Sequence, residues 1–527
     1  MAQKRIAVIG AGVCGLGAIK CCLDEDLEPT CFERSDDIGG LWKFQKNTAE
    51  KLPSIYRSLT INTSKEMMCY SDYPIPDDFP NYMHNSKVME YFRMYAKHFN
   101  LLKYIRFKAK VQSIKKRPDF SSSGQWDVVV EANEQQESLV FDGILVCSGH
   151  HTDPNLPLQS FPGIERFKGN YFHSREYKSP EEFLGKRIIV IGIGNSGADI
   201  AVELSRDAKQ VFLSTRHGSW ILHRVWDNGY PMDTSFFTRF NNLLQKIASF
   251  RITNNQLEKK LNSRFNHAHY DQFLKKPNDD LPNHIISGKV LVKPNVKEFT
   301  KTAAIFEDGT IEEDIDVVIF ATGYNISFPF LEDLIKVTNN EVSLYKLMFP
   351  PDLEQPTLAV IGLIQPLGIV LPIAELQSRW ATRVFKGVWM KLGETHTFPS
   401  HFRYVKSPRH TIQVDHIEYM DEIATQIGVK PNLLWLFLWD PKLAWKVFFG
   451  PCTPYQYRLR GPRKWDGARR AILTQTERIL KPMKTRTINN ERNPSSEISW
   501  VKMAPVSFVI LASVLSYYCY IYHPERK

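Results

Sequence analysis

The sequence predicts an α/β protein with two Rossmann-like dinucleotide-binding domains, a mostly helical insertion and a C-terminal transmembrane anchor. Three observations predict this fold class: two glycine-rich turns that each lie between an apolar strand and a helical pattern, alternating strand and helix signals, and one uncharged segment near the C-terminus. With 527 residues, 43% of them hydrophobic, the chain is long enough for several domains with a large core.

The first glycine-rich turn follows the apolar run 6–9 and reads Gly10-Ala11-Gly12-Val13-Cys14-Gly15. Between a strand and a helix, G-x-G-x-x-G permits a tight turn and brings a pyrophosphate close to the helix N-terminus. The next strand ends at Glu33, whose carboxylate suits a free ribose 2′-hydroxyl. We therefore expect Gly10, Gly12, Gly15 and Glu33 to bind a dinucleotide without a 2′-phosphate.

The second turn follows the apolar run 188–191 and reads Gly192-Ile193-Gly194-Asn195-Ser196-Gly197. Here the next strand is followed by Thr215 and Arg216, which suit a 2′-phosphate rather than a hydroxyl. The simplest assignment is FAD at the first turn and NADPH at the second, which makes the protein a flavoprotein reduced by hydride. We expect Gly192, Gly194, Asn195, Ser196, Gly197, Thr215 and Arg216 to bind NADPH.

Changes in composition and periodicity divide the chain into seven stretches. A turn-rich interruption within residues 104–131 also predicts an antiparallel insertion in the first of them. We expect the FAD-binding domain, first part, at 1–154; the NADPH-binding domain, first part, at 155–217; a mostly helical insertion at 218–287; the NADPH-binding domain, second part, at 288–324; the FAD-binding domain, second part, at 325–440; a C-terminal segment and linker at 441–500; and a membrane anchor at 501–527.

The anchor prediction rests on residues 503–522, MAPVSFVILASVLSYYCYIY, which contain no charged side chain. As a helix, about 20 residues just span a hydrocarbon core of about 30 Å, and the tyrosines near one end suit a membrane interface. The alternative is a buried C-terminal helix, because the segment is short and Pro505 lies in its first turn. We favour an anchor that attaches a cytosolic catalytic body to the lipid bilayer.

The formal charge of +10 is mild for this length, and no arginine-rich arm or alternation of basic and aromatic residues points to nucleic acid. The eight cysteines contain no C-x-x-C pair, which argues against a metal-binding knuckle or a thioredoxin-like motif. Residues 35–68 contain no cysteine, so a disulfide oxidoreductase, which would also use FAD and NADPH, is disfavoured.

Several further motifs resemble those of the flavin-containing monooxygenases. Residues 167–177 match F-x-G-x-x-x-H-x-x-x-Y, residues 321–324 read A-T-G-Y, and residues 62–69 resemble the stretch that faces the flavin ring. Residues 449–452 and 464–469 look like those of the vertebrate microsomal, dimethylaniline N-oxide-forming branch. The resemblance covers nearly the whole chain.

This resemblance implies an NADPH- and O₂-dependent enzyme that oxygenates soft nitrogen- and sulfur-containing nucleophiles, including foreign compounds, through a C4a-hydroperoxyflavin. It implies attachment to the endoplasmic reticulum membrane, with the catalytic body facing the cytosol, and it leaves a homo-oligomer open. It implies a catalytic role for Asn62, which would bond to the peroxide or hold NADP⁺ against it. Further cofactor contacts carried over from the family are Gly40, Leu41 and Trp42 over the flavin, Asn62 and Thr63 near flavin and nicotinamide, Arg224 in the NADP site, and Gln365 close to the nicotinamide.

Two segments depart from the family pattern, 267–278 by its length and 391–408 by its alignment, so substrate preference is the least transferable property. Baeyer–Villiger oxygenation of carbonyl compounds stays open as an alternative activity, as does an uncoupled NADPH oxidase that releases hydrogen peroxide. His173, within the 167–177 motif, is expected to be structural rather than a catalytic base.

Overall fold

The computed structural model describes residues 3–46, 52–216, 219, 221–247, 276–277, 279–331, 334–366, 368–388 and 410–485. Residues 1–483 form one compact unit, and residues 484–527 are assigned to a second. The predicted anchor at 501–527 and the segment 391–408 lie outside the described residues, as do 267–275. In the part that is described, no helix combines the length and apolarity needed to cross a membrane.

The first sheet is parallel throughout, and its strands run in the order β22-β7-β1-β2-β3. Chain order reverses beside β1, so the carboxyl ends of β1 and β7 border the crevice where open α/β sheets bind ligands. The strands are β1 (Arg5–Ile9), β2 (Glu28–Glu33), β3 (Ile105–Phe107), β7 (Gly143–Val146) and β22 (Leu358–Val360).

Side chains alternate between the two faces of this sheet, and each face has its own core. Val8 and Leu145 pack with α1 (Val13–Asp24) and α10 (Leu371–Lys386), which contact each other closely. Ile9 and Val146 pack instead with the antiparallel strands. These strands are β4 (Ala109–Lys116), β5 (Trp126–Ala132) and β6 (Gln135–Phe141), so the predicted antiparallel insertion is present.

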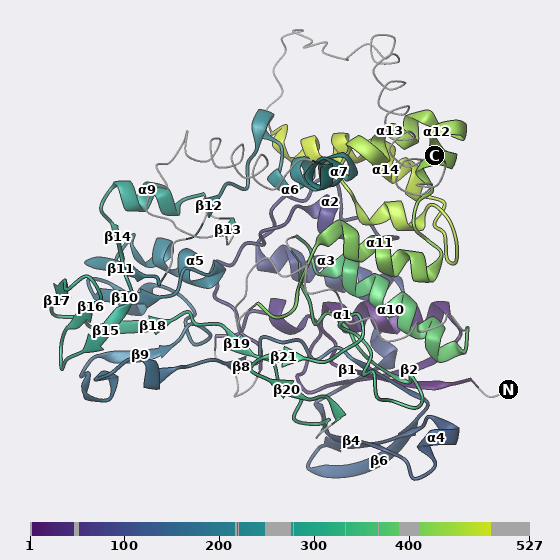
Figure 1. Ribbon diagram of the computed structural model, residues 1–527, viewed down its shortest axis with the longest axis horizontal. Coiled ribbons are helices and arrows are strands. Elements are labelled where there is room, and N and C mark those ends of the chain that lie inside the picture. Colours follow the sequence, from purple (N-terminus) through teal and green to yellow (C-terminus); the bar gives the residue numbers. More distant parts are fainter. Residues whose placement is uncertain are drawn as a thin grey trace, which may run out of the picture. The chain divides into compact units, whose positions relative to one another are not determined.

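The second sheet repeats this plan. It is also parallel, with the order β14-β11-β10-β18-β9. Helices α5 and α9 cover one face, and a small antiparallel sheet packs on the other (Figure 1). The elements are β9 (Asn170–His173), β10 (Arg187–Ile191), β11 (Gln210–Ser214), β14 (Val290–Lys293), β18 (Val317–Phe320), α5 (Asn195–Leu204) and α9 (Leu281–Ile286), with β15 (Val296–Phe299), β16 (Ala304–Phe306) and β17 (Ile311–Glu312) in the small sheet.

Two connections join the sheets. The short strands β8 (Asp153–Pro154) and β19 (Tyr324–Asn325) pair where the chain enters and leaves the second sheet. Beside them, Tyr56 donates a hydrogen bond from its hydroxyl to Asp199 of α5 at 2.6 Å. The two Rossmann-like layers are therefore tied together by backbone pairing and by side chains.

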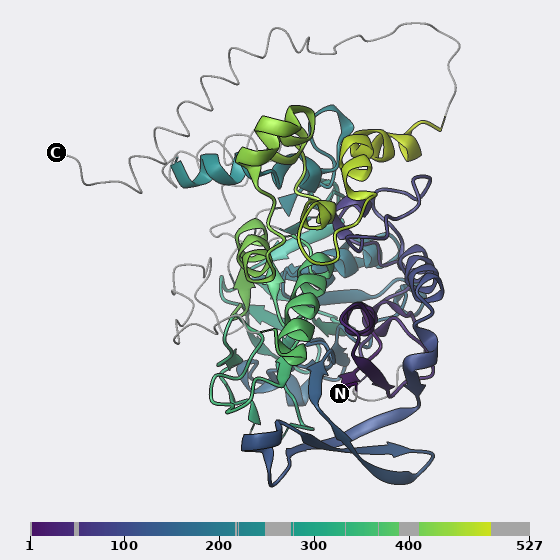
Figure 2. The same ribbon diagram turned by 90° about the vertical axis from the view of Figure 1, so that its right-hand side faces the viewer.

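The described part of 218–287 contains helices α6 (Met232–Phe236), α7 (Arg239–Ile247) and α9, with one pair of two-residue strands, β12 (Ile221–Leu222) and β13 (Lys276–Pro277). Helix α7 contacts α13, which also packs against α12 and α14. These four helices gather at one end of the unit (Figures 1 and 2). The remaining helices are α2 (Lys65–Met68), α3 (Asn85–His98), α4 (Phe120–Ser123), α11 (His416–Ile427), α12 (Leu433–Trp439), α13 (Pro441–Phe449) and α14 (Ala468–Leu480).

Candidate functional site

The first glycine-rich turn lies at the crevice of the first sheet. Gly10 adopts φ +101°, and a Cβ there would lie 2.9 Å from the carbonyl oxygen of Cys147, the residue that follows β7. A Cβ on Gly15 would lie 1.9 Å from the carbonyl oxygen of Gly10, so the start of α1 packs directly on the strand end. Both positions require glycine because backbone atoms occupy the space that a side chain would need.

Gly12 has the opposite surroundings, since a Cβ there would meet only Gly40, at 3.7 Å. Gly40, Leu41 and Trp42 form a single 3-10 turn, which is held to the glycine-rich turn by the hydrogen bond from Gly39 N–H to Ala11 carbonyl (3.0 Å). All three of these residues are half-buried. The backbone thus forms a side-chain-free strip between Gly12 and Gly40, which is the shape that a pyrophosphate requires.

Glu33 is buried at the carboxyl end of β2, directly beside this turn. Its carboxylate accepts hydrogen bonds from the backbone N–H of Ala11 (2.7 Å) and of Ser35 (2.8 Å). A carboxylate has about four acceptor positions. Glu33 can therefore hold the turn and still accept bonds from ribose hydroxyls.

The second glycine-rich turn is built in the same way. A Cβ on Gly192 (φ +106°) would lie 2.6 Å from the carbonyl oxygen of Ala321, which follows β18, and one on Gly197 would lie 1.8 Å from that of Gly192. Around Gly194 no atom lies within 4 Å of the Cβ position. Asn195 and Ser196 begin α5 beside this open space and are exposed and half-buried respectively.

Both helix starts fit phosphate groups. Neither α1 nor α5 has an acidic residue in its first turn or a side chain that caps it. The first N–H groups of a helix have no partner within the helix, and the helix dipole favours an anion there. The residues present therefore fit two dinucleotides, one at each crevice.

Thr215 and Arg216 follow β11, one strand away from the second turn. Thr215 is half-buried, and its backbone N–H donates to the carbonyl of Lys293. Arg216 is exposed and makes no hydrogen bond or ion pair with the part of the chain that the structure describes. Its guanidinium is thus available to a ligand phosphate on the second sheet.

Asn62 and Arg224, which are 162 residues apart, are in direct contact. Arg224 Nη2 donates to Asn62 Oδ1 at 2.6 Å, and the guanidinium also pairs with Asp279. Asn62 and Thr63 precede α2 and are half-buried, whereas Arg224 follows β12. This contact joins a residue expected beside the flavin to one expected in the NADP site.

Hydrogen bonds and an ion pair fix the residues that directly follow Asn62 and Thr63. Ser64 N–H donates to Asp233 Oδ2 at 2.6 Å, and Glu66 forms a two-pronged ion pair with Arg478 of α14 (2.9 and 2.7 Å). Lys65 is buried and donates to backbone carbonyls, among them that of Phe79 at 2.9 Å. Desolvation lowers the pKa of Lys65 to about 8. Asn62 therefore lies on a rigid support rather than on a free loop.

Asp233 gives a pH prediction, because burial raises its pKa from 3.8 to about 6. A raised pKa means that the folded protein binds the Asp233 proton more tightly than the unfolded chain does. The protonated carboxyl therefore contributes its full stabilisation of the fold below pH 4, and this contribution is lost as pH rises through 6. Asp233→Asn keeps an acceptor for Ser64 N–H but cannot ionise. Between pH 5 and pH 7 the variant should gain about 1.4 kcal/mol relative to the parent protein. Melting curves at several pH values would measure this, and parallel pH trends for the two proteins would contradict it.

Gln365 lies in β23 (Gln365–Pro366), which pairs with β24 (Gln413–Val414). It is half-buried, and its Oε1 lies 3.0 Å from His410 Nδ1. The structure shows no contact between Gln365 and the Asn62–Arg224 pair. His173 is buried, with Nε2 2.9 Å from the carbonyl of Gly323. Burial lowers the pKa of His173 to about 4, which agrees with the structural role expected for it.

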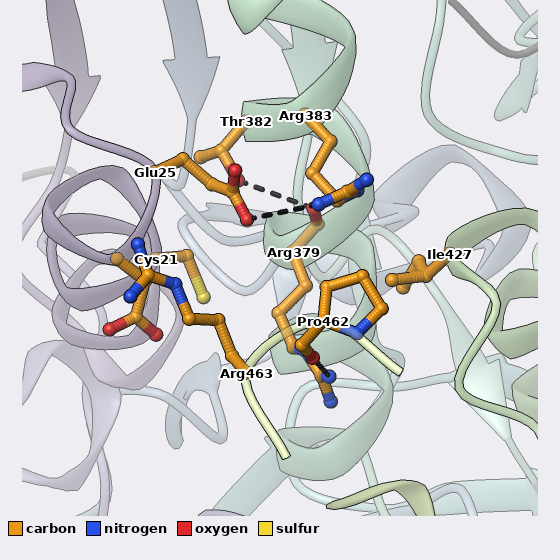
Figure 3. A pocket seen from close by; sticks show the side chains of 9 residues that line it. Cys21, Glu25, Arg379, Thr382, Arg383, Ile427, Pro462 and Arg463 are labelled. Atoms are coloured by element: carbon orange, nitrogen blue, oxygen red, sulfur yellow. Dashed lines mark hydrogen bonds and ion pairs between the residues drawn. The ribbon is translucent and has the colours of Figure 1, made fainter. Parts of the chain in front are cut away.

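Figure 3 shows a cavity elsewhere in the molecule, between α1 and α10. Arg379 and Arg383 of α10 line it, together with Cys21 and Glu25 of α1, and Arg383 pairs with Glu25 at 3.3 Å. It has room for about one water molecule, so it is too small for an organic substrate.

Sequence reasoning missed Asp233 and Asp279. Each lies in the stretch expected to be a helical insertion, and each contacts the Asn62 region only through the fold. Single acidic residues are common in helices and loops alike, so spacing alone carries no signal for Asp233 in α6 or for Asp279.

Comparison with known proteins places these features in one family. Residues 3–519 match the family model described as flavin-binding monooxygenase-like. The chain is 60% identical over 538 residues to flavin-containing monooxygenase 5 of Rattus norvegicus, covering 98% of this chain and 100% of that protein. It is 55% identical over 537 residues to dimethylaniline monooxygenase [N-oxide-forming] 2 of the same species, covering 98% of each.

Solved structures share the fold at low identity. S-allyl-L-cysteine S-oxygenase from Allium sativum superposes with a TM-score of 0.59 at 24% identity, covering 81% of this chain and 89% of that one. An open structure of cyclohexanone monooxygenase superposes with a TM-score of 0.55 at 16% identity, covering 74% and 88%. These likenesses show the fold, an α/β architecture with two parallel sheets.

Proposed function

The chain belongs to the flavin-binding monooxygenase family and is an NADPH-dependent FAD oxidoreductase, and we propose that it oxygenates soft nitrogen- and sulfur-containing nucleophiles. The observation that supports the proposal is the bond between Asn62, expected beside the flavin, and Arg224, expected in the NADP site. Hydride transfer needs the nicotinamide and the flavin in contact, and this junction lies between the elements that would hold them.

When bound, FAD would supply the redox chemistry of the reaction, namely acceptance of hydride and transfer of one oxygen atom from O₂ to the substrate. The balance is NADPH, H⁺, O₂ and substrate converted to NADP⁺, water and oxygenated substrate. This reaction requires no acid–base dyad from the protein. Gly12 and Gly194 leave room for the phosphates, Glu33 would bind the flavin's ribose, and Asn62 would orient the reacting groups and keep water from them.

Purified protein with FAD, NADPH and O₂ should convert a small thioether to its sulfoxide or a tertiary amine to its N-oxide. Mass spectrometry with ¹⁸O₂ would show one labelled oxygen in the product. Efficient ester formation from ketones without sulfoxidation would favour the Baeyer–Villiger alternative. If NADPH consumption yields only hydrogen peroxide with many nucleophiles and ketones, the protein is an NADPH oxidase and both oxygenase functions are excluded.

Arg216 should set the coenzyme preference. A charge-assisted contact to a phosphate contributes about 1.5–3 kcal/mol, so Arg216→Ala should raise the KM for NADPH about 10- to 100-fold and leave the KM for NADH nearly unchanged. Arg206→Ala, which removes an exposed arginine beyond the far end of α5, is the matched control. Steady-state kinetics with both coenzymes provide the measurement. An equal rise in KM for both coenzymes would show that a residue other than Arg216 contacts the phosphate.

For the protein's location, we propose attachment to the endoplasmic reticulum membrane through residues 501–527, with the catalytic body in the cytosol. The described part offers support for membrane attachment in α12. Leu438 and Trp439 are 77% and 72% exposed, and Leu434 and Trp435 more than half exposed. Tryptophan at a polar–apolar boundary is typical of membrane interfaces. Helix α14, the last described α-helix, packs on α13, and α13 also packs on α12.

Truncation after residue 499 should give an active protein that is released from membranes by alkaline carbonate. Residual binding of the truncated protein to lipid vesicles should fall several-fold when Trp435 and Trp439 are both replaced by serine. Sedimentation with vesicles provides the measurement, and Trp465→Ser is the control, because Trp465 packs against the core rather than facing solvent. Truncated protein that aggregates while the full chain is well behaved would make the last segment part of the folded body.

A further inference from the structure

The carboxylate of Asp279 pairs with Arg224, although the proposed reaction does not itself require a carboxylate there. Asp279 Oδ2 accepts from Arg224 Nη1 at 3.2 Å, and Asp279 Oδ1 accepts from the backbone N–H of Arg224 at 2.8 Å. The other arm of the guanidinium, Nη2, donates to Asn62 Oδ1 at 2.6 Å. The guanidinium of Arg224 therefore bonds to two acceptors at once: Asp279 in the 218–287 stretch, and Asn62 beside the expected position of the flavin.

The backbone of Arg224 has further anchors besides its N–H bond to Asp279. Its carbonyl accepts from the Tyr82 hydroxyl at 2.7 Å and from Met232 N–H at 2.7 Å. A change at Asp279 thus leaves the chain in place and releases mainly the long side chain, which has several rotamers to explore.

The guanidinium decides how the Asn62 amide is turned. An arginine can only donate, so the amide atom that faces it must be the oxygen. The Asn62 amide nitrogen then points elsewhere, and it makes no hydrogen bond to the part of the chain that the structure describes. Turning the amide over would place its N–H₂ against the guanidinium, with two donors facing each other.

We propose that Asp279 is a positioning residue: by fixing Arg224, it locks the Asn62 amide with its N–H₂ group directed toward the bound cofactors. The proposal rests on the proposed function for its kinetic effect, but its geometric part stands without it. Asp279 does not touch the reacting atoms; it acts through Arg224.

Asp279→Asn in the FAD-loaded full-length protein tests the proposal, with Asp280→Asn as the matched control. Asp280 is the neighbouring residue and its carboxylate lies 4.0 Å from Arg206 instead. We expect unchanged flavin content in both variants. Asp279→Asn should lower the product formed per NADPH at least 3-fold and raise hydrogen peroxide release, whereas Asp280→Asn should not. Asp279→Glu should restore part of the coupling.

Two further readouts separate positioning from a general structural role. In the Arg224→Lys background, Asp279→Asn should have little additional effect on coupling, because lysine lacks the fork that joins Asn62 to Asp279. In a crystal structure of the Asp279→Asn variant, the guanidinium of Arg224 should no longer lie within hydrogen-bonding distance of Asn62.

Full coupling in Asp279→Asn, independent additive effects of the two substitutions, or an unmoved guanidinium would each overturn the proposal. If the parent protein oxygenates no substrate, the proposed function fails, and the crystal structure still decides whether Asp279 positions Arg224. If Asp279→Asn does not fold, Asp279→Ser with the same three readouts takes its place.

Discussion

Gly15→Ala should be isolated as a colourless protein with less than about a tenth of the normal FAD content. The added Cβ would lie 1.9 Å from the carbonyl oxygen of Gly10, so the start of α1 must move away from β1. That movement breaks the alignment of the helix N-terminus with the crevice, and the overlap involves backbone atoms that no rotamer change can relieve. The absorbance of the purified protein near 450 nm, relative to that at 280 nm, measures the loss.

Gly194→Ala is the matched control in the second turn. No atom of the described residues lies within 4 Å of its Cβ position, and Gly194 has a φ of −67°, which alanine also adopts. This variant should remain yellow and should be reduced normally by dithionite. Reduction by NADPH should slow at least 10-fold, because the methyl group occupies the space expected for the pyrophosphate. A yellow Gly15→Ala protein, or normal NADPH reduction of Gly194→Ala, would contradict the assignment of that turn.

Asn62→Ala should bind FAD and be reduced by NADPH, yet lose at least 10-fold in oxygenated product per NADPH consumed. The Asn62 side chain is bonded to Arg224 through its Oδ1, and we expect its amide nitrogen to face the bound cofactors. Without it, reduced flavin would still react with O₂, and the electrons would leave as hydrogen peroxide. Parallel measurement of NADPH, product and peroxide tests this.

Asn295→Ala is the comparison for Asn62→Ala. Asn295 is bonded to Glu307 on the far side of the second sheet and should be dispensable for coupling. A normal yield of product per NADPH in Asn62→Ala would show that Asn62 only shapes its turn.

Local patterns were sufficient to predict the two nucleotide-binding layers. A strand, a glycine-rich turn and a helix follow one another within about 20 residues, so spacing alone places Gly10 and Gly192 at strand ends. The antiparallel sheet β4-β5-β6 was also visible, because its turn-rich interruption separates two alternating runs.

Contacts that depend on the tertiary fold could not be read in this way. The pairing of β12 with β13 involves two residues on each strand, too few to show a period. The bonds from Asp233 to Ser64 and from Asp279 to Arg224 join residues 169 and 55 positions apart. The assignments of the site residues to cofactor binding and catalysis, Gly40, Leu41, Trp42, Thr63 and Gln365 among them, and the seven domain ranges stay predictions.

Strand β22 carries a consequence for how the polypeptide is made. It completes the first sheet beside β7, yet the whole second sheet is encoded between these two strands. During synthesis, the whole second sheet therefore leaves the ribosome before the first sheet can be completed by β22. Glu66 gains its ion-pair partner Arg478 later still. Until then β7 has an unpaired edge, a surface prone to wrong association and one that chaperones shield. We expect nascent chains that end before residue 358 to depend on chaperones, and FAD to be captured only when synthesis is nearly finished.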